Sequence, residues 1–413
     1  MLNYLWLGFF IAGSLAGLTQ WLWFGDADVM SRMVSSLFNM AKVSVEIMVV
    51  LFGTLALWLG LLKIAEQAGL VDTLARWLSP LFARLMPEVP RGHPALGLIT
   101  MNYAANGLGL DNAATPVGLR AMRELQMLNP RPDTATNAQI LFLVLNTSSL
   151  TILPVTIFMY RMQQGAPDPA LVFLPILLAT SASTLAGLLA VAWVQKLPMR
   201  DPVVMLWLGA TALVISGILA VAASVSAATL THLSTLTGNL VILAFITLFL
   251  IVGALRKVPV YESFIEGAKD GFNIARDLLP YLVAMLCAIG FLRASGALDF
   301  LLAGIRMLFE WLGTDTRFID ALPTALVKPF SGSAARGLMI ETMQHYGVDS
   351  FAGLMAATIQ GSTETTFYVL AVYFGSVGIS RARHAVGCAL VADLAGIVTA
   401  IAVCYLFFAN GIP

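Results

Sequence analysis

Runs of about 20 apolar residues recur along this chain, and they constrain its fold more than any other feature. A helix needs roughly 20 apolar residues to cross a hydrocarbon core about 30 Å thick. Clear runs lie approximately at 5–23, 47–62, 140–160, 171–194, 203–225, 241–255, 278–292, 354–373 and 385–408. The sequence therefore predicts an all-α, polytopic membrane protein, and we expect a multi-pass protein of the inner cell membrane.

The composition supports this prediction and excludes several classes of function. Only 11% of the residues are charged, whereas soluble domains carry about 25%. The 23 Lys and Arg residues together balance the 23 Asp and Glu residues, so the net charge does not indicate a nucleic-acid partner. The three cysteines show no spacing typical of a zinc site. We expect a small-molecule substrate and the lipid bilayer as partners, no metal site and no bound cofactor, and the sequence leaves a homo-oligomer open.

An internal repeat divides the chain. Four short matches occur in the same order in both halves, and the offset falls from 227 to 209 residues. The matched pairs are Gly69 with Gly296, Gly118 with Gly337, Asn146 with Gln360, and Gly187 with Gly396. The polar, proline-bearing segment 196–202 separates a first repeat, 1–200, from a second repeat, 201–413. Two repeated helical bundles are typical of secondary transporters, and we expect inverted repeats.

Two further apolar stretches, 94–122 and 321–343, are interrupted by polar residues, glycine and proline. Such interruptions release backbone groups toward a ligand and indicate broken or re-entrant helices. The candidate substrate-binding residues in these stretches are Asn102, Asn106, Asp111 and Asn112 in the first half, and Lys328, Ser331, Ser333 and Arg336 in the second.

A second pair of polar clusters lies inside the apolar runs 140–160 and 354–373. Its candidate binding residues are Asn146, Thr147, Ser148 and Ser149, and Gln360, Ser362, Thr363, Glu364 and Thr365. Hydroxyl groups of this kind also occur in seams where helices pack. Charged groups within a membrane are costly and usually functional. We therefore expect Glu364, with Asp111 as the other candidate, to bind a coupling cation, H⁺ or Na⁺.

These clusters carry a family resemblance. Segments 328–337 and 360–368 resemble spore maturation protein B, and segments 101–116 and 145–154 resemble spore maturation protein A. The chain thus resembles a fusion of the two, over roughly 41–193 and 267–408. Both belong to the family with the nucleoside-recognition gate domain, which is related to concentrative nucleoside transporters and to the membrane domain of the ferrous-iron permease. The resemblance implies a membrane transporter or gate without naming its substrate.

Three classes of function remain open. A secondary transporter of a small polar solute is favoured by the repeat. The carboxylates of Asp111 and Glu364 balance the cations of Lys328 and Arg336, which favours a neutral or zwitterionic solute, such as a nucleoside or an amino acid. The alternatives are a non-transporting scaffold or signalling component in envelope biogenesis, and a membrane-embedded enzyme. The best constellation for an enzyme is Glu341 and His345, with His384 and Asp393.

Overall fold

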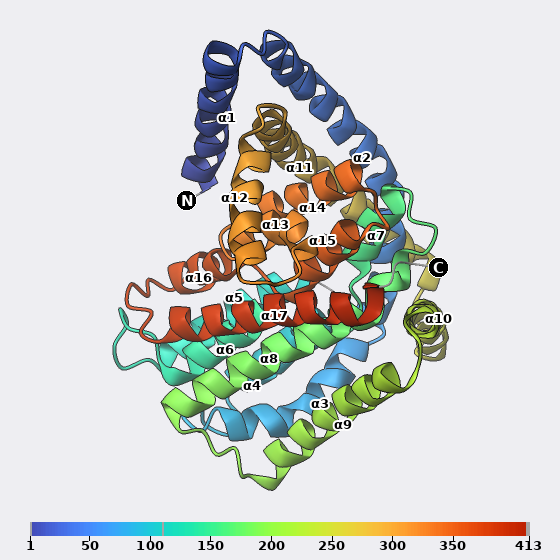
Figure 1. Ribbon diagram of the computed structural model, residues 1–413. Helices are drawn as coiled ribbons and strands as arrows, with labels where there is room; N and C mark the ends of the chain where they lie inside the picture. The colour runs from blue at the N-terminus through green and yellow to red at the C-terminus, as the bar shows by residue number, and fades with distance from the viewer. Residues whose placement is uncertain (1, 110, 410–413) are drawn as a thin grey trace.

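The computed structural model describes residues 2–109 and 111–409, and this part of the chain is helical (Figure 1). The first half contains α1 (Leu2–Phe24), α2 (Val29–Gln67), α3 (Leu70–Leu85), α4 (Pro94–Gly107), α5 (Asp111–Met127), α6 (Asn137–Ser148), α7 (Val155–Gln163), the 3₁₀ helix η1 (Pro169–Val172) and α8 (Phe173–Gln195). The second half contains α9 (Pro202–Ser224), α10 (Ala227–Leu255), α11 (Val260–Ala294), α12 (Ala297–Trp311), the 3₁₀ helix η2 (Arg317–Ala321), α13 (Leu322–Val327), α14 (Gly332–Tyr346), α15 (Phe351–Ser362), α16 (Thr366–Gly375) and α17 (Ala385–Phe408).

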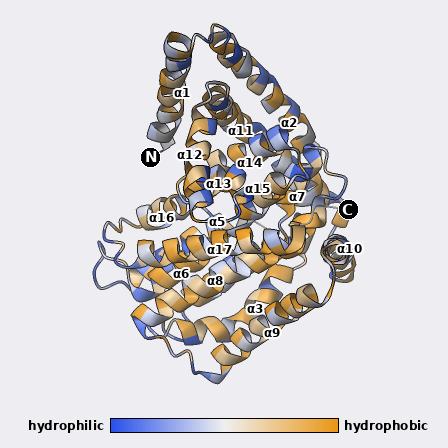
Figure 2. Cartoon of the chain, viewed as in Figure 1, coloured by the Kyte–Doolittle hydropathy of each residue, from blue (hydrophilic) through white to orange (hydrophobic). Residues whose placement is uncertain are grey.

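Within the described residues, seven helical segments are long and apolar enough to cross a membrane: 6–24, 29–67, 169–195, 202–224, 227–255, 260–294 and 385–408. Figure 2 shows apolar residues along these helices and hydrophilic residues concentrated in the loops. The chain is therefore a multi-pass membrane protein, as its sequence predicts.

The prediction of a continuous helix is wrong for two of the expected spans. The run 140–160 is divided between α6 and α7, and the run 354–373 is divided between α15 and α16. The first break begins at Ser149, whose φ is +29°, and ends at Pro154, which has no backbone N–H to donate. In the second break, Thr363 and Thr365 are extended. The polar residues between apolar flanks thus mark interruptions of the helix.

The α-helices α2 to α8 of the first half correspond, in the same order, to α11 to α17 of the second half. Gly69 and Gly296 both adopt left-handed backbone conformations (φ +65° and +73°), and each precedes an amphipathic helix, α3 or α12. A left-handed conformation favours glycine at both positions. The other matched pairs fall on α5 with α14, α6 with α15, and α8 with α17.

The counterpart helices α2 and α11 pack against each other and run antiparallel. Lys63 forms an ion pair with Glu266 at 3.4 Å near the end of α2 and the start of α11. Phe52 stacks on Phe272, with ring centroids 4.5 Å apart. The thiol of Cys287 donates to the carbonyl of Leu37 at 3.5 Å. As the residue number rises along α11, it falls along α2.

The counterpart helices α8 and α17 also cross in an antiparallel manner, near the middle of the molecule (Figure 1). A Cβ added at Gly187 would lie 3.1 Å from the Cβ of Ala392, and one added at Gly396 would lie 3.1 Å from the Cβ of Ser183. Ser183 and Ala392 are separated by the same 209 residues as the two glycines. The two contacts are therefore each other's counterparts, and exchanging the halves preserves the crossing.

The crossing of α2 and α11 predicts the effect of a single methyl group. A Cβ at Gly267 would clash with the carbonyl oxygen of Leu59, which is backbone and cannot move aside alone. Overpacking of this kind costs roughly 1–3 kcal/mol. We expect Gly267→Ala to lower the melting temperature in detergent.

Gly53 on α2 is the control, because nothing lies within 4 Å of a Cβ added there. Gly53→Ala should leave the melting temperature unchanged or raise it slightly, since alanine favours helix. Equal melting temperatures for the two variants would contradict the close packing of α2 against α11.

Candidate functional site

A cavity of about 280 Å³ lies where four helix interruptions meet, two from each half of the chain. The interruptions include residues 108–109, 149–154, 328–331 and 363–365. The first half contributes Asn106, Gly109, Thr115, Asn146, Thr151, Leu153, Pro154, Thr156 and Ile157. The second half contributes Lys328, Gly332, Arg336, Gln360, Gly361, Thr363, Glu364, Tyr368, Val369 and Tyr373. Each interruption supplies at least one lining residue.

Backbone groups in the interruptions bond to backbone groups at the ends of neighbouring helices. The N–H of Ile152 donates to the carbonyl of Gly107 at 3.0 Å, and in the second half the N–H of Phe367 donates to the carbonyl of Pro329 at 3.0 Å. The N–H of Glu364 crosses between the halves and donates to the carbonyl of Thr147 at 2.8 Å. Since an unsatisfied backbone group in a membrane costs several kcal/mol, these bonds allow the helices to be broken.

The structure brings part of the predicted site together. The predicted residues that line the cavity are Asn106, Asn146, Lys328, Arg336, Gln360, Thr363 and Glu364. Eight predicted residues that the structure describes do not line the cavity: Asn102, Thr147, Ser148, Ser149, Ser331, Ser333, Ser362 and Thr365. The side chains of Asp111 and Asn112 lie outside the described residues.

Several of the predicted hydroxyl residues have structural roles. The hydroxyls of Thr147, Ser148 and Ser362 donate to carbonyls three residues earlier in their own helices, at 2.9, 3.4 and 2.8 Å. Ser331 caps α14, because its hydroxyl oxygen accepts from the N–H of Ala334 at 3.2 Å. Local bonds of this kind satisfy the hydroxyls without a ligand.

A buried amide network joins the two halves on one side of the cavity. The side-chain oxygen of Asn146 accepts from the Nδ2 of Asn106 at 3.0 Å and from the hydroxyl of Tyr373 at 3.2 Å. The Nδ2 of Asn102 donates to the carbonyl of Ala114 at 2.8 Å and makes a longer contact of 3.4 Å to the Tyr373 hydroxyl. The network fixes α4, α6 and α16 relative to one another.

Among the described residues, the charged groups that line the cavity come from the second half. Lys328 is only 3% exposed, and its ammonium donates to the carbonyl of Gln360 at 2.9 Å. The guanidinium of Arg336 lies 5.5 Å from the centre of the Tyr160 ring. Glu364 is half-buried and lines the same cavity. A solute in the cavity thus meets groups of both signs.

Several lining residues, Tyr373 among them, are absent from the predicted set, and so is Asp393, which the sequence suggests only for an enzyme. Tyr373 lies in an apolar run with no polar neighbour nearby, so nothing in the sequence marks it. Asp393 lies in the apolar helix α17, and the repeat places it opposite Thr184. That charged residue inside a predicted span was a visible signal of function.

Three residues of the constellation considered for an enzyme, Glu341, His384 and Asp393, each bond to a residue outside it. Glu341 is buried in an ion pair with Arg293, whose Nη2 donates to Oε2 at 2.9 Å. The ring of His384 contacts Gln195 at 3.0 Å. Asp393 accepts a hydrogen bond from Thr366. This geometry gives no support to the enzyme alternative.

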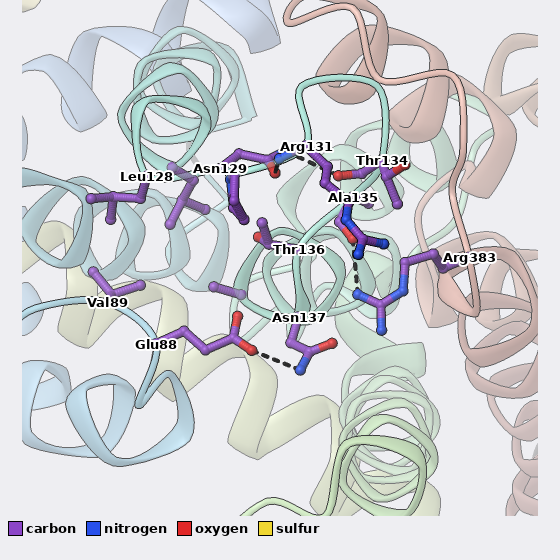
Figure 3. Close-up of a pocket in the computed structure, with 13 residues that line it drawn as sticks. Glu88, Val89, Leu128, Asn129, Arg131, Thr134, Ala135, Thr136, Asn137 and Arg383 are labelled. Atoms are coloured by element: carbon purple, nitrogen blue, oxygen red, sulfur yellow. Dashed lines mark hydrogen bonds between the residues drawn. The ribbon is translucent and has the colours of Figure 1, made fainter.

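A larger pocket, of about 590 Å³, lies among loops away from the interruptions (Figure 3). It is lined by segments 88–89, 125–138 and Arg383. Asn137 donates to Glu88 at 2.8 Å, and Arg383 donates to the carbonyl of Ala135 at 3.0 Å. None of the predicted site residues whose side chains the structure describes lines this pocket, so we assign the candidate site to the smaller cavity.

Comparisons with known proteins agree with the repeat. The model of the Gate family, described as nucleoside recognition, matches residues 48–163 and 275–380, which start 227 residues apart. Spore maturation protein B of Bacillus subtilis (strain 168) is 46% identical over 161 residues, which cover 39% of this chain and 89% of that protein. Spore maturation protein A of the same organism is 34% identical over 189 residues, which cover 46% of this chain and 93% of that protein. No solved structure matches.

The amide network predicts a specific loss of stability. Tyr373→Phe removes the hydroxyl that contacts Asn146 while it keeps the ring, which stacks on Phe142 at 5.6 Å between centroids. A lost hydrogen bond costs about 1 kcal/mol. We expect a lower melting temperature in detergent than for Tyr281→Phe, a change at an exposed tyrosine on α11. Equal melting temperatures for the two variants would show that the network does not hold the halves together.

Proposed function

The chain belongs to the nucleoside-recognition Gate family, and from this premise we propose that it is a secondary transporter of a small polar solute. The two copies of the family domain account for the two halves of the fold. In transporters built from repeats, the substrate binds near the bilayer midplane, at helices that are discontinuous. The cavity between the four interruptions is the observation that carries the proposal.

We propose further that the halves are inverted repeats. The counterpart pairs α2 with α11 and α8 with α17 are each antiparallel. A rotation that exchanges two antiparallel counterparts reverses their direction through the membrane. Inverted repeats of this kind support alternating access, in which one bundle moves against the other around a fixed site.

The size and polarity of the cavity support a small neutral or zwitterionic solute, with a nucleoside-like molecule as one candidate. Its volume is just below the roughly 300–1,000 Å³ of pockets that enclose drug-sized ligands. Lys328, Arg336 and Glu364 offer both signs of charge. The Oε1 of Gln360 is buried and has no hydrogen-bond partner among the described residues, so it can accept from an N–H or O–H of the solute.

The alternative function is a scaffold in envelope biogenesis, and a binding measurement distinguishes it from a transporter. The names of the two relatives refer to spore maturation, but they do not state an activity. A scaffold needs no polar cavity at the centre of its helices, whereas a transporter does. Thermal-shift screening of the purified protein against nucleosides, nucleobases and amino acids separates the two, because a ligand of the folded state raises its stability.

Gln360 gives a prediction for solute binding. Gln360→Leu keeps most of the side-chain volume and removes the free acceptor. We expect the affinity for the solute found by thermal-shift screening to fall about tenfold, which is the loss of one hydrogen bond. The control is Gln344→Leu, at an exposed position of α14 outside the cavity. Unchanged affinity in the Gln360 variant would remove this residue from the site.

Glu364 gives a prediction for coupling. Glu364→Gln keeps the shape of the side chain and removes its charge. We expect the variant to bind solute in proteoliposomes but to lose the dependence of uptake on the imposed proton or ion gradient. Uptake with the same gradient dependence as the unaltered protein would show that the coupling group lies elsewhere.

A further inference from the structure

A buried carboxylate lies beside the cavity, on α17. Asp393 is 2% exposed, and its Oδ2 accepts from the hydroxyl of Thr366 at 2.7 Å. Its Oδ1 has no hydrogen-bond partner within residues 2–109 and 111–409, which the structure describes. An ionised carboxylate removed from water costs several kcal/mol unless it is compensated. A carboxylate within a membrane helix indicates a function, and it requires a partner that compensates its charge.

Two more buried side chains pack against the same face of α17. The hydroxyls of Ser183 and Thr363 have no hydrogen-bond partner among the residues that the structure describes. A Cβ built at Gly396 would meet both side chains, at 3.1 Å from the Cβ of Ser183 and 2.7 Å from the Cγ2 of Thr363. The carbonyl oxygen of Ser362 lies 3.3 Å from the same point. Asp393 precedes Gly396 by three residues, so the two share one face of α17.

We propose that Asp393, Ser183, Thr363 and the carbonyl of Ser362 bind a sodium ion. Hard cations prefer oxygen ligands such as carboxylates and carbonyls. The C-terminal end of a helix carries partial negative charge, and α15 ends at Ser362. Unwound carbonyls and the C-terminal ends of half-helices coordinate Na⁺ in transporters. Lys328 and Glu364 also interact with the Asp393 carboxylate, with opposite signs, so one sodium ion balances the charge of Asp393.

The first half lacks this carboxylate. The counterpart of Asp393 is Thr184, whose hydroxyl donates to the carbonyl of Ser148 at 3.4 Å. Ser148 is itself the counterpart of Ser362, by the offset that pairs Asn146 with Gln360. The first half thus closes the equivalent contact with a hydroxyl and a carbonyl, while the second half brings a carboxylate to it. The ion site therefore belongs to one half only.

The ion site is adjacent to the solute site. Thr363 belongs to both, because it lines the cavity and also lies against Gly396. Lys328 donates to the carbonyl of Gln360, two residues before Ser362, on the same helix end. An ion at Asp393 would stabilise the break between α15 and α16 in the form that presents Gln360 and Thr363 to the solute. This coupling rests on the proposed transport function, but the binding of sodium does not.

The test measures sodium binding on the purified full chain in detergent. We expect NaCl to raise the melting temperature relative to choline chloride at equal ionic strength, because a ligand of the folded state stabilises it. Asp393→Asn should abolish this difference. Ser183→Ala and Thr363→Val each remove one ligand and should weaken the apparent affinity for Na⁺ about tenfold. The control is Asp270→Asn, at an exposed carboxylate of α11.

Equal melting temperatures of the unaltered protein in the two salts would overturn the proposal, as would a sodium response that survives Asp393→Asn. If Asp393→Asn fails to fold, the two hydroxyl variants still decide, and an unchanged affinity in both would count against the site. A melting temperature that depends on pH through Asp393 but not on sodium would replace Na⁺ with a proton. Sodium binding without solute uptake in proteoliposomes would contradict the transport function and leave the ion site in place.

Discussion

The need to satisfy every backbone N–H and C=O group inside the membrane controls this structure. A helix that crosses a bilayer satisfies its own groups, and a broken helix does not. Here the helices of each half are interrupted twice, at 108–109 and 149–154 in the first half and at 328–331 and 363–365 in the second. The freed groups bond to one another, as the N–H of Glu364 does with the carbonyl of Thr147 across the two halves. The cavity exists because these four interruptions are placed together.

Close helix crossings hold the interruptions in register. Gly187 and Gly396 let α8 and α17 approach at equivalent points, and Gly267 and Gly271 let α11 approach the backbone of α2. Small residues give membrane helices this proximity, which is the main source of packing energy when lipid tails are as apolar as the side chains. Since each crossing joins a helix to its own counterpart, the contacts are shared equally by the two repeats. The same helix crossings therefore produce both the symmetry and the close packing of the two halves.

The sequence predicts the membrane class, the repeat and four polar clusters, since these depend on composition and local pattern. It predicts the breaks at 94–122 and 321–343 from glycine and proline. The breaks at 149 and 363 lie in runs apolar enough to resemble full spans, so their polar residues were placed within continuous helices. Tyr373 joins the site only through contacts with residues far away in the sequence, such as Asn146, and no local pattern contains that information. Asp393 is marked by its charge within an apolar run, but its contact with Thr366 is visible only in the fold.

The central claim is that one cavity shared by two inverted halves serves a transport cycle, and its accessibility tests this without knowledge of the solute. Tyr368 lines the cavity and is exposed, so a cysteine there can react. Tyr368→Cys would be made after Cys287, Cys388 and Cys404 are replaced by alanine, and labelled in oriented proteoliposomes with a membrane-impermeant thiol reagent. Alternating access predicts labelling from both sides of the membrane. Labelling from one side only, or from neither, would contradict it.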